Sequence, residues 1–152
     1  MSTAHVRAQR ELRIAAPANI VFHLFTPKGE ELWIDAWRPR YIHPQDGTTV
    51  CGMVFATGNG PEHTLWQLVE FDTARRRSVY ARTTPGARIG TVTVEVDTLD
   101  PISSRALIRY EMTALAEGPV LAPYLEPAFG QLIDGWEATI RERLPMLIAA
   151  LA

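Results

Sequence analysis

The C-terminal stretch PVLAPYLEPAFGQLIDGWEATIRERLPMLIAALA, residues 119–152, decides the fold. Its apolar residues recur every three or four positions, which is the period of one face of an α-helix. The residues that carry this period are Leu121, Leu125, Phe129, Leu132, Trp136, Ile140, Leu144, Leu147 and Leu151. A helix of this length measures roughly 45–50 Å, whereas a strand of eight residues spans only about 26 Å. A sheet that packs on this helix must therefore wrap around it.

Three prolines limit this helix. Pro123 and Pro127 leave its first turns undefined by the pattern. Pro145 lacks the N–H group that a helix interior uses, and its ring crowds the carbonyl of Arg141. We therefore expect one long helix from about Pro119 onward, with a kink or a break in its last turns.

The segments before the helix alternate between apolar and polar residues, which is the period of a strand with one buried face. This pattern predicts strands over residues 63–71, 77–83, 89–99 and 105–115, and the turn sequences DTARR, TPGA and DPIS separate them. Short connections of this kind predict an antiparallel meander. In the first of these strands Trp66 and Val69 lie in opposite phases, which predicts a β-bulge near Leu68.

The N-terminal third predicts one more regular strand and two short helices. Residues 6–14 alternate as a strand, although Arg10 falls among the apolar positions. Ala16-Pro17 opens a short helix, and Thr26-Pro27 opens a second one that ends near Trp33. Residues 35–60 are rich in glycine and proline, and we expect a strand over 50–57 with long loops. The whole order predicts an α+β fold.

Length and composition narrow the class of protein. The 152 residues form a single domain over 1–152, and 47% apolar residues allow a real core. A net charge of −2 disfavours nucleic-acid partners. One cysteine excludes an intramolecular disulfide, and neither a signal peptide nor a membrane span is evident. We expect a cytoplasmic protein with no membrane partner, either a monomer or a homodimer.

Four parts of the chain carry a resemblance to a known superfamily. They are RELRIAAPANIVFHLFTPKGEELW (10–33), HPQDG (43–47) with GMVFAT (52–57), TPG (84–86) and GQLIDGWEATIRERL (130–144). With them the chain resembles the SRPBCC or START-like superfamily, whose helix-grip fold is shared by polyketide cyclases, pollen allergens and activators of the heat-shock ATPase. The resemblance implies a curved antiparallel sheet of about six or seven strands wrapped around the long helix. It also implies a cavity for apolar or aromatic ligands between sheet and helix.

Motifs for common catalytic chemistry are missing from the sequence. It holds no nucleophile elbow, P-loop or dinucleotide-binding glycine motif. We expect Cys51 to be a small buried hydrophobe rather than a nucleophile. His43, Asp46 and His63 are the nearest approach to a metal site, but nothing fixes a third ligand. We therefore expect neither a metal nor a cofactor.

Aromatic residues supply the candidate ligand-binding site, because flat apolar side chains line most small-molecule pockets. The candidates are Arg10, Phe25, Trp33, Trp37, Phe55, Trp66, Tyr80, Tyr110, Met112, Phe129 and Trp136. Each aromatic member has a plain core role as its alternative. We expect Trp136 to be a core residue, whereas Trp33 and Trp37 border the entrance of the cavity.

Arg10 is the polar outlier of its strand, and a buried arginine needs an acceptor. The acceptor is a ligand group, or it is a carboxylate among Glu70, Glu95 and Glu111. Alternatively, the side chain extends out to solvent from a strand end.

Three functions are compatible with these features. The first is binding of a small hydrophobic or aromatic molecule. The second is a cyclase or aromatase, for which Tyr110, Tyr80 and Arg10 are the available proton-transfer groups. The third is a protein-interaction module like the heat-shock ATPase activators, although the polar outer faces of the strands disfavour it.

Overall fold

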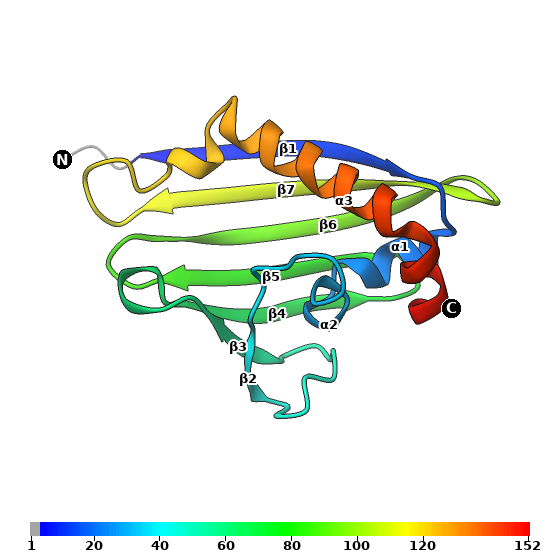
Figure 1. Cartoon of the computed structure of the whole chain (residues 1–152). Helices are drawn as coiled ribbons and strands as arrows, with labels where there is room; N and C mark the ends of the chain where they lie inside the picture. The colour runs from blue at the N-terminus through cyan, green and yellow to red at the C-terminus, as the bar shows by residue number, and fades with distance from the viewer. Residues whose placement is uncertain (1–3) are drawn as a thin grey trace.

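The long C-terminal helix lies across the concave face of a curved seven-stranded antiparallel sheet (Figure 1). The computed structural model describes residues 4–152. The strands lie in the order β1-β7-β6-β5-β4-β3-β2, so β1 and β2 form the two edges. The elements in chain order are β1 (His5–Ile14), α1 (Ala18–Leu24), α2 (Pro27–Glu30), β2 (Arg40–His43), β3 (Val54–Thr57), η1 (Gly60–Glu62), β4 (Thr64–Asp72), β5 (Arg77–Thr84), β6 (Arg88–Asp100), β7 (Ser103–Ala114), η2 (Ala122–Tyr124) and α3 (Ala128–Leu151). This architecture confirms the α+β helix-grip prediction.

Alternation in the sequence translates directly into the two faces of the sheet. Val92, Val94 and Val96 of β6 are buried on the concave face. Ala106, Ile108 and Tyr110 continue the same face on β7. The predicted bulge is confirmed, because the pairing of β4 with β5 shifts register between Leu68 and Glu70. The meander thus has the register that its hydrophobic pattern predicts.

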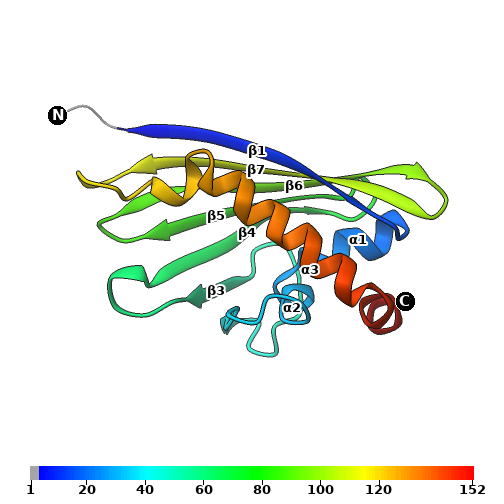
Figure 2. The same cartoon turned by 45° about the horizontal axis from the view of Figure 1, so that its top comes forward.

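The long helix is shorter than its apolar period suggested. It has 24 residues and begins at Ala128, directly after Pro127, whereas residues 122–124 form a separate 3-10 turn. Pro123 and Pro127 break the segment because neither can donate a backbone hydrogen bond. The helix continues through Pro145 without a break. Its last turns bend away from the preceding axis (Figure 2), so of the two expected outcomes the helix has a kink.

Residues 35–60 contain more sheet than the sequence indicated. The segment predicted as loop before residue 50 includes β2, and β3 is confined to Val54–Thr57 rather than 50–57. β2 pairs with β3 with a register shift between Tyr41 and His43. An edge strand of four residues has too few alternating positions to be visible in the sequence.

One helix cannot cover the whole concave face. α3 packs against β1, and α1 packs against β6 and β7. α2 is the helix drawn nearest to β4 and β5 (Figures 1 and 2).

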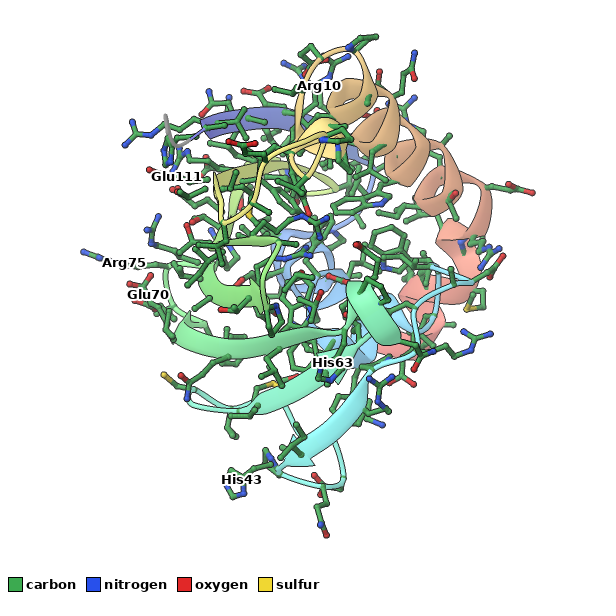
Figure 3. The ribbon with its side chains drawn as sticks, turned by 90° about the vertical axis from the view of Figure 1, so that its left-hand side faces the viewer. Arg10, His43, His63, Glu70, Arg75 and Glu111 are labelled. Atoms are coloured by element: carbon green, nitrogen blue, oxygen red, sulfur yellow. The ribbon has the colours of Figure 1, made fainter. Side chains whose placement is uncertain are left out.

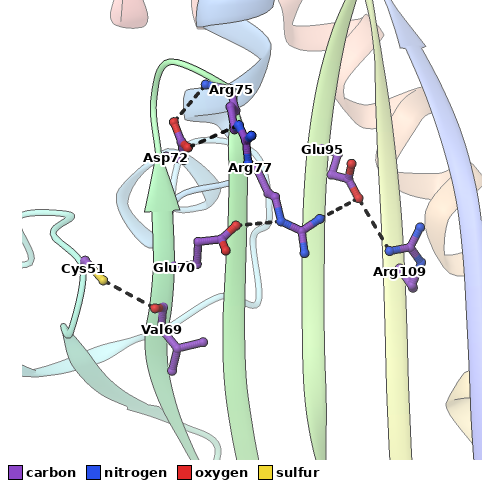
Figure 4. Close-up of polar contacts among 8 residues, drawn as sticks. All are labelled: Cys51, Val69, Glu70, Asp72, Arg75, Arg77, Glu95 and Arg109. Carbon is purple, nitrogen blue, oxygen red and sulfur yellow. Dashed lines mark hydrogen bonds and ion pairs between the residues drawn. The ribbon is translucent and has the colours of Figure 1, made fainter.

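The convex face carries a ladder of ion pairs (Figure 4). The Arg77 guanidinium lies 2.6 Å from the Glu70 carboxylate and 2.9 Å from that of Glu95. Arg109 reaches the same Glu95 carboxylate at 3.5 Å. This polar surface disfavours the interaction-module hypothesis for the part of the convex face that it covers.

Arg88 ties the loop before α3 to the sheet from a buried position. Its Nε–H donates to the Val120 carbonyl at 2.6 Å, and Nη1 donates to Thr84 Oγ1 at 3.3 Å. The Glu62 carboxylate lies 3.2 Å from Nη1. The Arg88 guanidinium therefore fixes the position of the loop before α3.

Replacing Arg88 with Met should lower the free energy of unfolding by about 2–3 kcal/mol, because charged hydrogen bonds contribute roughly 1.5–3 kcal/mol. Urea denaturation measures the effect. Arg105→Met is the matched control, since Arg105 pairs with Asp97 and Glu11 on the surface and such pairs contribute below about 1 kcal/mol. Equal losses in the two variants would contradict the anchoring role.

Candidate functional site

A cavity of about 220 Å³ lies between the sheet, α2 and α3. Its wall is mainly aromatic and aliphatic, with a few polar groups. The lining residues are Phe25, Pro27, Glu30, Ile34, Trp37, Phe55, Trp66, Tyr80, Arg82, Val92, Val94, Ile108, Tyr110, Leu132 and Trp136. A mainly apolar wall with a small number of polar side chains is the usual composition of a small-molecule site.

The aromatic wall is a connected cluster. The Phe55 and Trp66 rings, from neighbouring strands, stack with centroids 5.5 Å apart. Trp37 meets the Trp66 ring edge-on at 5.8 Å, and its Nε1–H donates to the Pro27 carbonyl at 3.0 Å. The Tyr80 hydroxyl donates to the Phe25 carbonyl at 3.0 Å. These bonds fix the rings in place and leave their apolar surfaces toward the cavity.

The short helix α2 places a carboxyl group in this wall. Thr26 caps the helix, because its Oγ1 accepts the Gly29 N–H at 3.0 Å, and Pro27 occupies the first turn. Position 29 requires glycine because the His23 backbone lies close to it, and a Cβ atom there would be 1.9 Å from the His23 carbonyl oxygen. Glu30 follows as the last residue of the helix and lines the cavity.

Glu30 is an uncompensated acid in an apolar setting. Its side chain makes no hydrogen bond or ion pair with residues 4–152. Burial raises the pKa of its carboxyl group well above the ordinary value, because desolvation penalises the charged form. Burial also raises the pKa values of the Tyr80 and Tyr110 hydroxyls. The cavity therefore favours a protonated Glu30.

Seven of the eleven residues predicted for the site line the cavity. They are Phe25, Trp37, Phe55, Trp66, Tyr80, Tyr110 and Trp136. Met112 and Phe129 are fully buried outside the wall, and Phe129 packs edge-on against the Tyr110 ring at 5.4 Å. They are core residues that support the wall from behind.

Arg10 lies outside the cavity, on the exposed flank where β1 meets α3 (Figure 3). Its Nη2 donates to the Asp134 carboxylate at 2.9 Å, and its Nε lies 3.3 Å from the same group. The partner is thus none of the glutamates proposed from the sequence. Arg10 does occupy an inward position of β1, but β1 is an edge strand and the side chain reaches the solvent side of the helix.

Trp33 and Trp136 have the opposite of the roles predicted for them. Trp33 is only 2% exposed, and its Nε1–H donates to the Leu24 carbonyl at 2.9 Å, so it is a core residue. Trp136 is half-buried and lines the cavity. The two rings pack edge-on at 5.7 Å. The sequence could not separate them because both lie on the same contact between α3 and the α2 region.

Glu30 and Arg82 are the important lining residues that the sequence reasoning missed. Arg82 falls in the inward phase of β5 with Tyr80, so it is a polar outlier of its strand as Arg10 is of β1. Glu30 lies in a four-residue helix, which is too short for a periodic signal.

The other candidate chemistry is dispersed. Among residues 4–152 no group of three or more His, Cys, Asp and Glu side chains could hold a metal ion. His43 lies at the outer end of β2, away from His63 (Figure 3). Cys51 is exposed, contrary to expectation, and its Sγ lies 3.5 Å from the Val69 carbonyl (Figure 4). Within the described chain, no helix is long and apolar enough to cross a bilayer.

Comparison with solved structures finds the same helix-grip fold in proteins of low sequence identity. Norcoclaurine synthase from Thalictrum flavum is similar with a TM-score of 0.67 at 16% identity, over 94% of this chain and 88% of that chain. A hypothetical protein from Helicobacter pylori gives 0.68 at 13% identity, over 97% and 88%. Ara h 8.0201 gives 0.62 at 14% identity, over 96% and 99%. No family model and no curated protein matches the sequence.

Trp33→Ala should lower the free energy of unfolding by about 3–5 kcal/mol, because it leaves a large void in the core. Trp136→Ala should cost less, since this side chain already borders a cavity and is partly exposed. Denaturant titrations of both variants provide the comparison. A greater loss for Trp136→Ala would restore the assignment made from the sequence.

Glu30→Gln should raise the melting temperature at pH 8 and change it little at pH 4. The unfolded chain loses the Glu30 proton at a pKa of about 4.3, whereas the folded chain retains it at higher pH. Stability therefore falls as the pH rises above the unfolded pKa, until Glu30 ionises in the folded state as well. Glutamine does not ionise, so the variant lacks this loss of stability at high pH.

Thermal melts from pH 4 to pH 9 measure the difference between wild type and Glu30→Gln. Glu117→Gln is the control, because Glu117 is exposed in the loop after β7. A difference for Glu30→Gln that stays constant with pH would contradict a raised pKa.

Proposed function

We propose that this protein binds a small aromatic or other flat apolar molecule in the cavity between the sheet, α2 and α3. The single observation that carries the proposal is the cavity itself, with its connected aromatic wall. A dry cavity of roughly 150 Å³ is large enough to bind benzene, so a cavity of about 220 Å³ suits a ligand of one or two fused rings.

A structural neighbour adds support by analogy of fold. Norcoclaurine synthase from Thalictrum flavum has been solved in complex with dopamine and hydroxybenzaldehyde, and its fold is similar to that of this chain with a TM-score of 0.67. At 17% identity this similarity concerns architecture, and functions differ widely among proteins of one fold. The lining of this chain's own cavity therefore bears the main weight of the proposal.

Filling the cavity should abolish binding. Val92 lines the cavity from the concave face of β6, and Val92→Phe adds volume there. We expect 2-naphthol to bind wild type with one-to-one stoichiometry in titration calorimetry and to bind Val92→Phe at least tenfold more weakly. Thr91→Phe is the matched control, because Thr91 is the neighbouring residue on the opposite face of the same strand.

Thermal melts of the two variants establish that both are folded. Absence of 2-naphthol binding to wild type, or an equal loss of affinity in the two folded variants, would contradict binding in this cavity.

A further inference from the structure

We propose that Arg82 is an anion-binding residue of this cavity, and that the ligand is an aromatic molecule carrying a carboxylate group. This inference rests on the proposed function and names the chemical class of its ligand. It is carried by the position of Arg82 in the wall, by the lack of an acceptor for its guanidinium, and by the shape of the space beside it.

Arg82 occupies an inner position of β5 between two strands that offer it no acid. Its partner on β4 is Trp66, and its partner on β6 is Gly90. The guanidinium carbon lies 4.4 Å from the centroid of the Trp66 ring and 5.9 Å from that of Tyr124. Two aromatic faces thus hold the cation at the cavity by cation–π attraction, and neither accepts a conventional hydrogen bond in the guanidinium plane.

The guanidinium lacks the partners that other arginines of this chain have. Arg77 has two carboxylates, and buried Arg88 has a carboxylate and a carbonyl. For Arg82 no ion pair or hydrogen bond exists within residues 4–152, and its Nε–H is completely buried without an acceptor. Leaving a buried charged donor unsatisfied is costly. An acceptor brought by a ligand would remove that cost.

Glu30 does not supply the missing charge. It lines the same cavity, but its carboxylate forms no ion pair with Arg82 within 4.0 Å. Burial raises the pKa of Glu30 and favours its neutral form. No carboxylate of residues 4–152 pairs with Arg82, so a monoanionic ligand would balance its charge.

The shape of the site selects among anions. The planar fork of a guanidinium matches the two oxygens of a carboxylate. The Tyr110 hydroxyl, which makes no hydrogen bond within residues 4–152, lines the same cavity and provides a further donor. About 220 Å³ of mainly apolar space accommodates a ring system and not a polyphosphate chain.

The test compares two probes of equal shape, 2-naphthoate and the neutral 2-naphthamide, by titration calorimetry at pH 7. Wild type should bind 2-naphthoate at least tenfold more tightly, as expected for a charge-assisted hydrogen bond. Arg82→Gln should lose this preference and retain its affinity for 2-naphthamide. Arg75→Gln, which removes a charge from a side chain that is 81% exposed, should keep the preference.

The comparison of the two probes on wild type needs no variant, so it tests the carboxylate preference even if Arg82→Gln fails to fold. Equal affinities of wild type for both probes would overturn the carboxylate inference while leaving the proposed function intact. A preference for 2-naphthoate that persists in folded Arg82→Gln would also overturn it. Failure of wild type to bind either probe would contradict both proposals.

Discussion

A strongly curved sheet leaves more space on its concave side than one helix can fill, and the rest of this molecule is a response to that constraint. α3 packs against β1, while α1 covers β6 and β7 from the other end. Over β4 and β5 the space is closed by α2 and by large rings from several elements. A cavity remains where their surfaces fail to meet.

The polar groups in that cavity interact more strongly because its wall is mainly apolar. A low local dielectric raises the cost of an ionised Glu30 and strengthens the attraction between Arg82 and the ring faces of Trp66 and Tyr124. The same aromatic wall thus performs two tasks. It provides apolar contact area, and it raises the pKa of the Glu30 carboxyl group.

The elements with a long regular period were predictable from the sequence. The strands from β4 to β7 and the helix α3 follow the alternation or the three-to-four spacing of their apolar residues. β2 was not predictable, because its four residues become a strand only by pairing with β3. The start of α3 was misplaced because an apolar period continues through Pro123 and Pro127, although the backbone cannot follow it.

The site was predictable in kind but not in its polar details. Aromatic residues near the irregular segment do line a cavity. Arg10 and Arg82 both occupy inward positions on strands, yet Asp134 of α3 satisfies Arg10 at the flank while Arg82 has no such partner within residues 4–152. That difference depends on where α3 crosses the sheet, and tertiary packing rather than the local sequence sets this position. For the same reason the sequence predicts Trp136 in the core and Trp33 at the cavity, whereas the structure shows the reverse.

The two edges of the sheet bear on how copies of this chain meet at high concentration. An unpaired edge strand invites another strand to add to it, and this is a common route to aggregation. At one edge β2 is only four residues long, which offers little template for pairing. At the other edge β1 carries the exposed charged residues Arg7, Glu11 and Arg13, and charged side chains on an edge strand disfavour pairing with another strand. Growth of the sheet from molecule to molecule is therefore discouraged at both ends, and any self-association is left to the faces and helices.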